Sequence, residues 1–453
     1  MKDDEGVTER GGTGGGTKRL TRRELLAGIA SGAAALAGPQ AGMAQFSGPA
    51  PARAAERAEQ RRGPRGERWD VLVVGGGVFG TWTAWDLLRK GKRVLLLDAR
   101  GPANARASSG GESRMTRAMY GADEIYTRMA WESLTEWKWL SESTDLPIFR
   151  RLGVLFFFEK MEPYAASTLE IHRKLSLPVE TLHRAELAQR FPQFSWDGIE
   201  FGLFEPDFGA LMARRAVQTL VKRFTAEGGE YRLAQVEAPH AARPEATALE
   251  QLVVRGGGLL KASDYVFACG PWLPKVFPDV LGSRISVTRQ EAFFFTEPAG
   301  DARFEPGPMP GWADFNGGDV FYGFPDLEAR GVKVAHDKHG PTMDPDSGDR
   351  LASTPALSEV RAYVGRRFPA LARQPLNESR VCQYENTWNG DFLIDRHPRW
   401  TNVWLVGGGS GHGFKHGPAV GRYAARLVSG EHFALEPRFS LATKREQQHR
   451  AVI

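Results

Sequence analysis

The sequence predicts a protein of mixed α/β class with α+β elements, in which one domain has a parallel sheet of discontinuous segments and the other has an antiparallel sheet. Three stretches lead to this prediction. Residues 69–100 have the pattern of a strand, a glycine-rich turn, a helix and a second strand, residues 401–430 repeat the first three of these elements, and residues 262–272 hold another apolar strand. Because these pieces stand near both ends and in the middle of the chain, the remaining segments are expected to be insertions.

The composition is that of an ordinary soluble globular chain. Its 453 residues are 42% hydrophobic and 25% charged, which is enough for a large core and two domains. The net charge of +5 belongs mainly to residues 1–68, because the rest of the chain carries 47 basic and 46 acidic residues. We therefore expect no nucleic-acid partner. Two cysteines form neither a disulfide framework nor a CxxC metal site, so no metal is expected.

Residues 1–44 have the features of an export signal. Arg22 and Arg23 stand in the stretch TRRELL, and the Ala- and Gly-rich run 25–38 follows. That run is about 14 residues long, whereas a membrane-spanning helix needs about 20, so we expect no stable membrane insertion. The stretch resembles a twin-arginine (Tat) signal, which predicts export of the folded protein to the periplasm or the exterior. The alternative is a disordered tail with a chance arginine pair on a cytoplasmic protein.

A linker is predicted between this signal and the first strand. Residues 45–68 are rich in Pro, Ala, Arg and Glu. Signal cleavage is expected after Ala44, in GMA, or after Ala54, in ARA, because small residues precede both positions.

The unit WDVLVVGGGVFGTWTAWDLLRKGKRVLLLDAR, residues 69–100, predicts a Rossmann-like dinucleotide site. Gly75, Gly77 and Gly80 stand in G-x-G-x-x-G spacing between the first strand and the helix, which permits a tight turn and close approach of a pyrophosphate to the helix N-terminus. Asp98 ends the second strand, where it can accept a hydrogen bond from a ribose hydroxyl. A chance glycine loop is the alternative, and the fingerprint alone does not separate FAD from NAD.

The C-terminal unit TNVWLVGGGSGHGFKHGPAVGRYAARLVSG, residues 401–430, adds information on the cofactor. It is again a strand, a glycine-rich loop and a helix. A second contact of this type, far along the chain from the first, suggests one long cofactor that touches both. This favours FAD over a nicotinamide cofactor.

Five stretches, taken in order, are similar to the motifs of a known family. They are VVGGGVFG, SSGGESRMTRAMYG (108–121), FYGFPDLEARGVKVAHD (321–337), VCQYENTWNGDFLIDRHP (381–398) and GGSGHGFKHGPAVG (408–421). With them the chain resembles the D-amino-acid-oxidase-like superfamily of FAD-dependent oxidoreductases, and within it the monomeric sarcosine, N-methyltryptophan and pipecolate oxidases. The likeness extends over residues 69–430.

The resemblance implies two domains. The FAD-binding domain is expected to comprise residues 69–148, 199–284 and 388–453, and the substrate domain residues 149–198 and 285–387. Candidate strands for the antiparallel sheet of the substrate domain are RLGVLFFF (151–158), VTRQEAFFF (287–295) and VFYGF (320–324).

Cys382 is expected to attach FAD covalently. In the sarcosine-oxidase-like enzymes a cysteine in a C-x-Y stretch, just before D-F-x-I-D, carries the flavin through its 8α-methyl group. Cys382, with Tyr384 and DFLID behind it, matches this pattern. A thiolate is a soft nucleophile suited to that bond. The alternative is a small buried thiol, and Cys269, in ACGPW, is interpreted in that structural sense.

Three cations and two tyrosines are implied to surround the substrate. Arg117 and Lys415 match family residues that hold the substrate carboxylate, and Arg114 matches an arginine beside the flavin ring. Tyr322 and Tyr384 match tyrosines that line the substrate cavity. The alternatives are surface cations and core tyrosines.

Lys333 is the expected oxygen-activating residue. It stands in GVKVAH, whose alternation predicts a strand. In the family this lysine sits over the flavin and stabilises the negative charge that develops on oxygen. A solvated lysine on an edge strand is the alternative, because periodicity does not distinguish the two.

The cofactor contacts that the resemblance implies cluster in the glycine-rich turns and the neighbouring strands. Val236 matches a strand residue that contacts adenine through its backbone. The full set is Gly75, Gly77, Val78, Phe79, Gly80, Asp98, Ser109, Arg114, Val236, Cys382, Gly411, His412, Gly413, Phe414 and Lys415.

The chain departs from the family pattern near the substrate. Gly110 stands where sarcosine oxidases have a histidine near the flavin, and His336 lies close to, but not clearly at, a second histidine position. Loss of an imidazole enlarges that part of the pocket, which leaves room for an amino acid bulkier than sarcosine.

The resemblance implies an FAD-dependent oxidase of N-methyl or secondary amino acids, acting on CH–NH bonds as a monomer. The substrate would give an imine, then an aldehyde and an amine, and oxygen would yield hydrogen peroxide. The alternatives are a flavin amine dehydrogenase with another electron acceptor, a primary or cyclic amino-acid oxidase of the same superfamily, a nicotinamide-dependent dehydrogenase, and a flavin-binding protein without turnover.

Overall fold

The first strand begins where the sequence predicts the linker to end. All described residues belong to one compact unit. The predicted signal segment and the predicted linker, except for Arg68, lie outside the described residues. The computed structural model describes residues 68–447 and 449, apart from 241–242 and 317–319.

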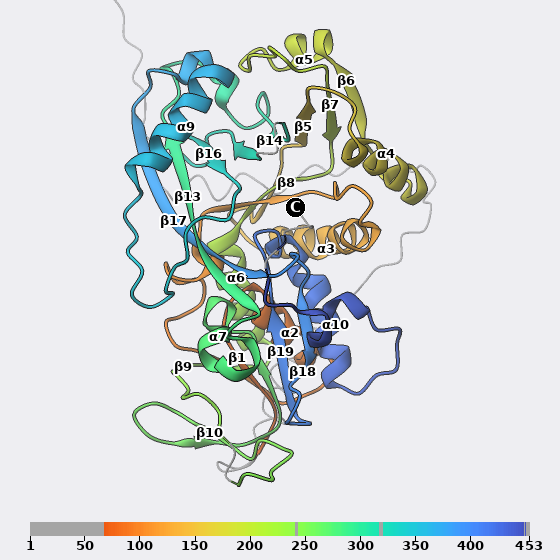
Figure 1. Cartoon of the computed structure of the whole chain (residues 1–453), viewed down its shortest axis with the longest axis vertical. Helices are drawn as coiled ribbons and strands as arrows, with labels where there is room; N and C mark the ends of the chain where they lie inside the picture. The colour runs from red at the N-terminus through yellow and green to blue at the C-terminus, as the bar shows by residue number, and fades with distance from the viewer. Residues whose placement is uncertain (1–67, 241–242, 317–319, 448, 450–453) are drawn as a thin grey trace, which may run out of the picture. The chain divides into compact units, whose positions relative to one another are not determined.

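Residues from three distant parts of the chain form a six-stranded, mainly parallel sheet (Figure 1). β1 pairs in parallel with β2 and β12, β12 with β19, and β2 with β9, whereas β18 is antiparallel to β19. The predicted assembly from discontinuous segments is therefore confirmed. In sheet order, the strands are β18 (Leu393–Arg396), β19 (Val403–Gly407), β12 (Ala262–Phe267), β1 (Trp69–Val74), β2 (Val94–Asp98) and β9 (Glu230–Leu233).

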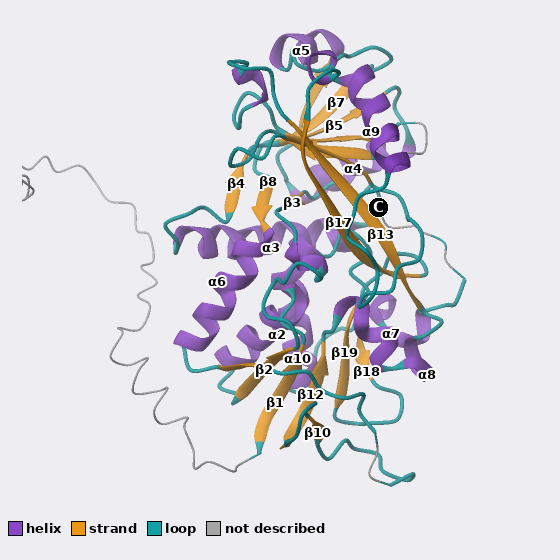
Figure 2. Cartoon of the chain, turned by 90° about the vertical axis from the view of Figure 1, so that its left-hand side faces the viewer, coloured by secondary structure: helices purple, strands orange, loops and turns teal. Residues whose placement is uncertain are grey.

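Both faces of this sheet are covered, which explains the continuous apolar runs of its strands. Val71 and Leu96 face the core formed with the long helices, and Leu72 and Leu95 face the opposite core, which includes Leu273. The long helices lie between the two sheets in Figure 2. They are α2 (Val78–Arg89), α3 (Glu124–Glu142), α6 (Ala213–Ala226) and α10 (Gly417–Val428), while α7 (Leu273–Val276) and α8 (Pro278–Leu281) cover the other face.

An eight-stranded sheet forms the second layer. Its neighbouring strands are antiparallel except for β14 and β5, which run in parallel. It is flanked by α4 (Pro163–Leu175), α5 (Arg184–Arg190) and α9 (Thr354–Arg367). In sheet order, the strands are β17 (Leu376–Thr387), β13 (Ile285–Phe295), β16 (Val332–His336), β15 (Phe321–Phe324), β14 (Gly311–Asp314), β5 (Val154–Phe158), β7 (Phe201–Glu205) and β6 (Glu180–His183).

Two expectations differ from the observed sheets. The segment 199–284 is expected in the FAD-binding domain, yet β7 at its start pairs with β5 and β6 of the eight-stranded sheet. The expected strand 151–158 is broken at Gly153, whose φ of +69° interrupts the extended backbone. Because all described residues form one compact unit, the division into two domains stays a prediction.

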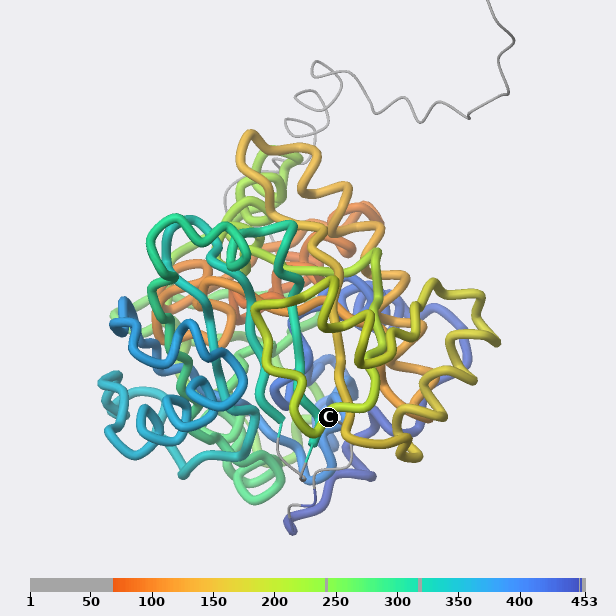
Figure 3. The backbone as a smooth tube through the Cα atoms, turned by 90° about the horizontal axis from the view of Figure 1, so that it is seen from above, coloured from red at the N-terminus to blue at the C-terminus, as the bar shows by residue number. Residues whose placement is uncertain are grey.

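A small sheet and two long strands connect the layers. β3 (Ser113–Thr116) pairs with β8 (Gly209–Met212), which also pairs with β4 (Phe149–Arg151). In Figure 2, β13 and β17 run from the eight-stranded sheet down toward the parallel sheet. Figure 3 shows the same backbone from above, with early described segments in orange and late ones in blue. Parts of the chain that are far apart in sequence meet near these strands, since the Ser108 hydroxyl donates to the Gln383 carbonyl oxygen over 2.7 Å.

Two smaller features complete the fold. The strands β10 (Leu252–Val253) and β11 (Leu259–Leu260) form a separate hairpin. None of the helices among the described residues is long and apolar enough to cross a membrane.

Candidate active site

The turn between β1 and α2 has the geometry of a dinucleotide-binding loop. Gly75 has a φ of +113°, and a Cβ there would lie 2.3 Å from the Ala268 carbonyl oxygen. A Cβ at Gly80 would lie 2.0 Å from the Gly75 carbonyl oxygen. Gly77 caps α2, and the following N–H, of Val78, donates to Ser109 Oγ over 3.1 Å. The turn thus brings the N-terminus of α2 to an open cavity, with the Ser109 hydroxyl on its first N–H group.

Asp98 lies at the end of β2 beside this turn. Its Oδ2 accepts from the Gly76 N–H over 2.7 Å, and its Oδ1 accepts from the Arg100 N–H over 2.8 Å. Burial raises the pKa of its carboxyl group, whereas these backbone hydrogen bonds act to lower it. Asp98 therefore fixes the glycine-rich turn and also faces the cavity that the turn borders.

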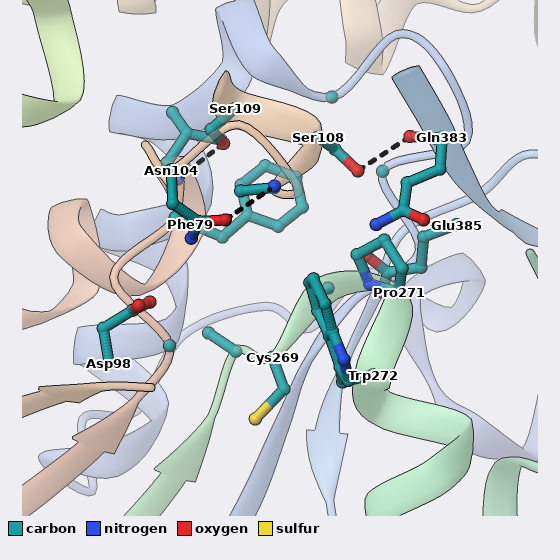
Figure 4. Close-up of a pocket in the computed structure, with 18 of the residues that line it drawn as sticks. Phe79, Asp98, Asn104, Ser108, Ser109, Cys269, Pro271, Trp272, Gln383 and Glu385 are labelled. Atoms are coloured by element: carbon teal, nitrogen blue, oxygen red, sulfur yellow. Dashed lines mark hydrogen bonds between the residues drawn. The ribbon is translucent and has the colours of Figure 1, made fainter. Parts of the chain in front are cut away.

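One cavity collects most of the expected cofactor residues (Figure 4). Its wall includes the β1–α2 turn, the end of β2, the turn after β12, part of β17 and the loop 409–414. The glycine turn without side chains and the N-terminus of α2 fit the diphosphate of a dinucleotide such as FAD. The expected residues that line it are Gly75, Gly77, Val78, Phe79, Asp98, Ser109, Arg114, Val236, Cys382, Tyr384, Gly411, Gly413 and Phe414.

A second cavity meets the first. Arg114, Cys382, Tyr384, Gly411 and Phe414 line both of them. The second cavity is also lined by the remaining residues expected at the substrate and oxygen sites, which are Arg117, Tyr322, Lys333 and Lys415. His412, expected to contact the cofactor, lines it as well. Of the expected site residues, only Gly80 lines neither cavity, because it lies inside α2 and packs against Gly75. A cofactor in the first cavity would therefore border a substrate in the second.

Arg117 and Lys415 stand over one aromatic ring. The Arg117 guanidinium carbon lies 4.1 Å, and the Lys415 Nζ 5.2 Å, from the centre of the Tyr120 ring. Arg117 donates to the Met119 carbonyl oxygen, and Lys415 Nζ donates to the His412 carbonyl oxygen over 2.8 Å. Burial and the nearby Arg117 charge hold the pKa of Lys415 well below its usual range. An incoming carboxylate would favour the charged form of Lys415.

A buried hydrogen-bonded group supports this pair and was not anticipated from the sequence. The Tyr120 hydroxyl lies 3.1 Å from His412 Nδ1 and 2.7 Å from His416 Nε2. Trp137 Nε1 donates to the Lys415 carbonyl oxygen over 2.7 Å. The spacing of His412 and His416 in GHGFKHG could have indicated that both rings share one side of this segment.

Lys333 is buried in the middle of the eight-stranded sheet. It lies on β16, between β13 and β15, and is only 4% exposed, so the alternative of a solvated edge-strand lysine is wrong. Its Nζ donates to the Ser113 carbonyl oxygen over 3.2 Å and lies 5.3 Å from the centre of the Tyr322 ring. Burial and the Arg114 charge lower the pKa of Lys333 to about 7. A lysine of this kind can change charge near neutral pH.

Cys382 and Arg114 meet where the two cavities join. Arg114 Nη2 donates to the Ser108 carbonyl oxygen over 2.6 Å and lies 3.6 Å from Cys382 Sγ. Tyr384, two residues on, is hydrogen-bonded to Tyr322, and burial raises the pKa of Tyr322 to about 12. The other cysteine, Cys269, is partly buried, and burial together with the carboxyl groups of Asp98 and Glu385 raises the pKa of its thiol far above the usual value.

The departures from the family pattern also have a structural place. A Cβ at Gly110 would lie 1.9 Å from the Asn104 carbonyl oxygen, so the backbone excludes any larger residue there. His336 lines the substrate cavity, stacks on the Phe321 ring at 4.3 Å and lies 3.1 Å from Glu359. The His336 imidazole, which is nearest to the histidine position expected from the family, therefore contacts the Glu359 carboxylate.

Glu385 is a further residue of the cofactor cavity that was not anticipated from the sequence. It follows Tyr384 on β17, is 7% exposed and accepts a hydrogen bond from the Gly408 N–H over 2.6 Å. Its burial could not be predicted from the residue pattern, because the segment alternates polar and apolar residues only weakly. Elsewhere among the described residues, no three His, Cys, Asp or Glu side chains stand close enough to hold a metal ion.

Comparison with known proteins gives consistent matches. The family model DAO, described as FAD dependent oxidoreductase, matches residues 70–427. The monomeric sarcosine oxidase of Streptomyces avermitilis is 30% identical over 80% of this chain and 93% of its own length. The N-methyl-L-tryptophan oxidase of Citrobacter koseri is 28% identical over 80% of this chain and 95% of its own.

The fold is also found among solved structures. NikD, described as an unusual amino acid oxidase essential for nikkomycin biosynthesis, matches with a TM-score of 0.67 at 23% identity, covering 83% of this chain and 97% of its own. L-proline dehydrogenase from P. horikoshii matches with a TM-score of 0.69 at 20% identity, covering 81% of this chain and 95% of its own.

Proposed function

The chain belongs to the DAO family of FAD-dependent oxidoreductases, and from this premise we propose that it is an FAD-dependent oxidase of N-methyl or other secondary amino acids. The family match and the relatives confirm the expected resemblance and the enzyme class. The observation that carries the proposal is the shared wall of two cavities. One cavity holds the dinucleotide turn, the other holds Arg117, Lys415 and Lys333, and Cys382 lies where they join.

The chain's own residues would bind and orient the substrate. When bound, FAD supplies the electron-accepting ring that no side chain provides. Arg117 and Lys415 would hold the substrate carboxylate, and each charge-assisted hydrogen bond would contribute roughly 1.5–3 kcal/mol. The Tyr120–His412–His416 group behind them keeps both cations in place. The substrate's amine end would then point to the shared wall of the cavities.

Lys333 would serve the reaction with oxygen. A cation held at the wall of the cavity stabilises negative charge that develops on oxygen, and a buried cation does so more strongly than an exposed one. Its contact with the Ser113 carbonyl oxygen fixes the ammonium group in place. This favours an oxidase, with hydrogen peroxide as product, over a dehydrogenase that uses another electron acceptor.

The shape of the substrate cavity supports a substrate larger than sarcosine. Phe156, Phe294, Phe315 and Val320 contribute apolar wall to it. The absence of a side chain at Gly110 adds no space, because the Asn104 carbonyl oxygen occupies the place of a Cβ there. An apolar N-substituent or side chain, or a cyclic amino acid, would bury its surface against these residues.

Covalent attachment of FAD through Cys382 is part of the proposal. Cys382 lines both cavities, its sulfur lies beside the Arg114 guanidinium group, and a cysteine sulfur is the nucleophile that a thioether bond requires. Cys269 instead has the carboxyl groups of Asp98 and Glu385 as its charged neighbours, and these disfavour a thiolate.

Export by a Tat signal is proposed from residues 1–44 alone. A flavoprotein acquires its cofactor in the cytoplasm, and the Tat route carries folded proteins, so the signal and the cofactor support each other. The stretch TRRELL is its basis.

Peroxide release from sarcosine, pipecolate, N-methyltryptophan and proline tests the proposed activity. We expect at least one of these substrates to bleach the flavin without oxygen and to yield peroxide with oxygen. If none of these substrates reduces the flavin of the yellow protein, whereas primary amino acids do reduce it, the chain belongs elsewhere in the superfamily.

A further inference from the structure

Glu385 is a buried carboxyl group in the wall of the cofactor cavity. It lies on β17 with 7% of its surface exposed. Figure 4 places it beside Pro271 and Gln383, at the side of the cavity formed by the turn after β12. Its Oε1 accepts from the Gly408 N–H over 2.6 Å. The group is therefore part of the cavity wall and is not a surface carboxylate.

Glycines from two separate loops make room for this carboxyl group. A Cβ at Gly407 would lie 2.2 Å from Oε1 of Glu385, and a Cβ at Gly270 would lie 3.4 Å from Oε2. Gly270 has a φ of +54° and follows Cys269 in the turn after β12. The carboxyl group thus fits a slot between the turn after β12 and the loop after β19.

This slot adjoins the dinucleotide turn. The Ala268 carbonyl oxygen lies against Gly75, and Cys269 Sγ lies 3.4 Å from the Val74 carbonyl oxygen. The turn after β12 therefore contacts the β1–α2 turn on one side and Glu385 on the other. A dinucleotide whose diphosphate lay at the N-terminus of α2 would pass this slot with the chain that links its two ring systems.

In the part of the chain that the structure describes, no charged group offsets a negative charge on Glu385. β17 packs against β13, η1 (Ser108–Gly110) and η2 (Gly270–Trp272), and the titratable group next to the carboxyl is the thiol of Cys269, the residue before η2. Among the described residues, the Gly408 N–H is the one group that favours the charged form. Burial therefore raises the pKa of Glu385 to about 8, and the group holds a proton at neutral pH.

We propose that Glu385 positions the cofactor in its protonated form, donating a hydrogen bond from its carboxyl group to an oxygen of the diphosphate or the ribityl chain of FAD. Oε1 is engaged as the acceptor for Gly408, so the proton of the neutral group would reside on Oε2, the oxygen next to Gly270 in the turn after β12. This inference rests on the proposed function only in requiring FAD as the cofactor.

The proposal has a pH dependence with a definite sign. Below the pKa of Glu385 the carboxyl group is neutral and donates. Above it the group loses the donor and places a negative charge beside a diphosphate, so affinity for FAD falls as the pH rises. One linked proton permits a loss of up to about tenfold per pH unit. Glutamine at this position keeps a neutral N–H donor at every pH.

The test measures FAD binding in place of turnover. Proteins that carry Cys382→Ala, which removes the proposed covalent bond, are stripped of flavin and titrated with FAD from pH 6.5 to 10, with flavin fluorescence as the readout. Three versions are compared: Glu385 retained, Glu385→Gln and Glu385→Leu. Glu170→Gln, an exposed glutamate on α4, is the matched control.

With Glu385 retained, we expect FAD affinity to fall at least tenfold between pH 7.5 and 9.5. We expect the FAD affinity of Glu385→Gln to change by less than about twofold over the same pH range. Glu385→Leu should bind FAD weakly at every pH. The control should show the same pH dependence as the protein that retains Glu385. If FAD affinity falls with pH to the same extent in Glu385→Gln as in the protein that retains Glu385, the role of the protonated form is overturned. Equal affinities in all versions would overturn the contact itself.

A spectroscopic measurement keeps the proposal testable if the variants do not fold. The infrared spectrum of the FAD-loaded protein at pH 7.5, minus that of the FAD-free protein, is expected to show a shift in a protonated carboxyl C=O band. Absence of any change in that region would overturn the proposal. A protein that binds FAD as expected yet oxidises none of the amino acids would contradict the proposed function and leave this inference standing.

Discussion

Arg114 Nη2 lies 3.6 Å from Cys382 Sγ, although 268 residues separate the two in the chain. The contact forms because β3 and β17, from opposite halves of the sequence, border the same junction between the two cavities. The Cys382 sulfur therefore borders both cavities, next to a fixed guanidinium group. This relationship is the basis of the first experiment.

Acid denaturation of the purified protein tests the attachment of FAD. We expect the yellow colour to precipitate with the polypeptide, and Cys382→Ala to release it into the supernatant. Cys269→Ala is the control from the same chain and is expected to keep the colour on the protein, because its thiol is buried away from Arg114. Release of flavin from the unchanged protein would show that Cys382 does not attach FAD.

Replacement of Lys333 by methionine should separate the two halves of the reaction. The apolar chain fills the same space without the charge, so reoxidation of the flavin by oxygen should slow on the order of a hundredfold, with flavin reduction much less affected. Stopped-flow spectroscopy measures both steps. Lys338→Met, at an exposed lysine that pairs with Glu359, is the control. Equal slowing of both steps would remove Lys333 from the oxygen reaction.

The same lysine predicts how the oxygen reaction depends on pH. Its pKa is lowered to about 7 by burial and by Arg114, so the charged form is present below that value and is lost as the pH rises through it. The rate constant for reoxidation should therefore decline above about pH 7 in the unchanged protein. In Lys333→Met the rate constant for reoxidation should be low and independent of pH. A profile that rises with pH would contradict a role for the ammonium charge.

Loss of one carboxylate contact should raise KM more than it lowers kcat. Arg117→Met removes roughly 1.5–3 kcal/mol of binding, which corresponds to roughly a 10- to 150-fold increase in KM. The matched control is Arg128→Met, an exposed arginine of α3 that pairs with Glu124. An amine that lacks a carboxylate should be oxidised equally by the unchanged protein and by Arg117→Met. If Arg117→Met weakens that amine as much as the amino acid, Arg117 has a structural role instead.

Export is tested by the arginine pair. Replacement of Arg22 and Arg23 by lysine should keep the protein in the cytoplasm, whereas the unchanged protein should appear outside it after cell fractionation. Flavin fluorescence identifies the protein in each fraction. An identical distribution of both proteins would leave residues 1–44 as a tail without an export function.

The sequence by itself determined the features that depend on neighbours along the chain. The strand, turn and helix of residues 69–100 follow from apolar runs and glycine spacing, and the structure has them as β1, α2 and β2. The motifs around Cys382 and Lys415 likewise allowed the family to be recognised before any contact was known. Such signals are local, because turn geometry and helix periodicity involve residues a few positions apart.

Only the tertiary structure decided which residues become buried together. Alternation marks Lys333 as part of a strand, but its burial depends on β13 and β15, which come from other parts of the chain. Periodicity likewise does not show that glycines of two distant loops enclose the Glu385 carboxyl, or that the Asn104 carbonyl oxygen excludes a side chain at Gly110. The charge state of a buried group depends on desolvation and on charges from every surrounding element, and the order of residues along the chain does not determine which elements those are.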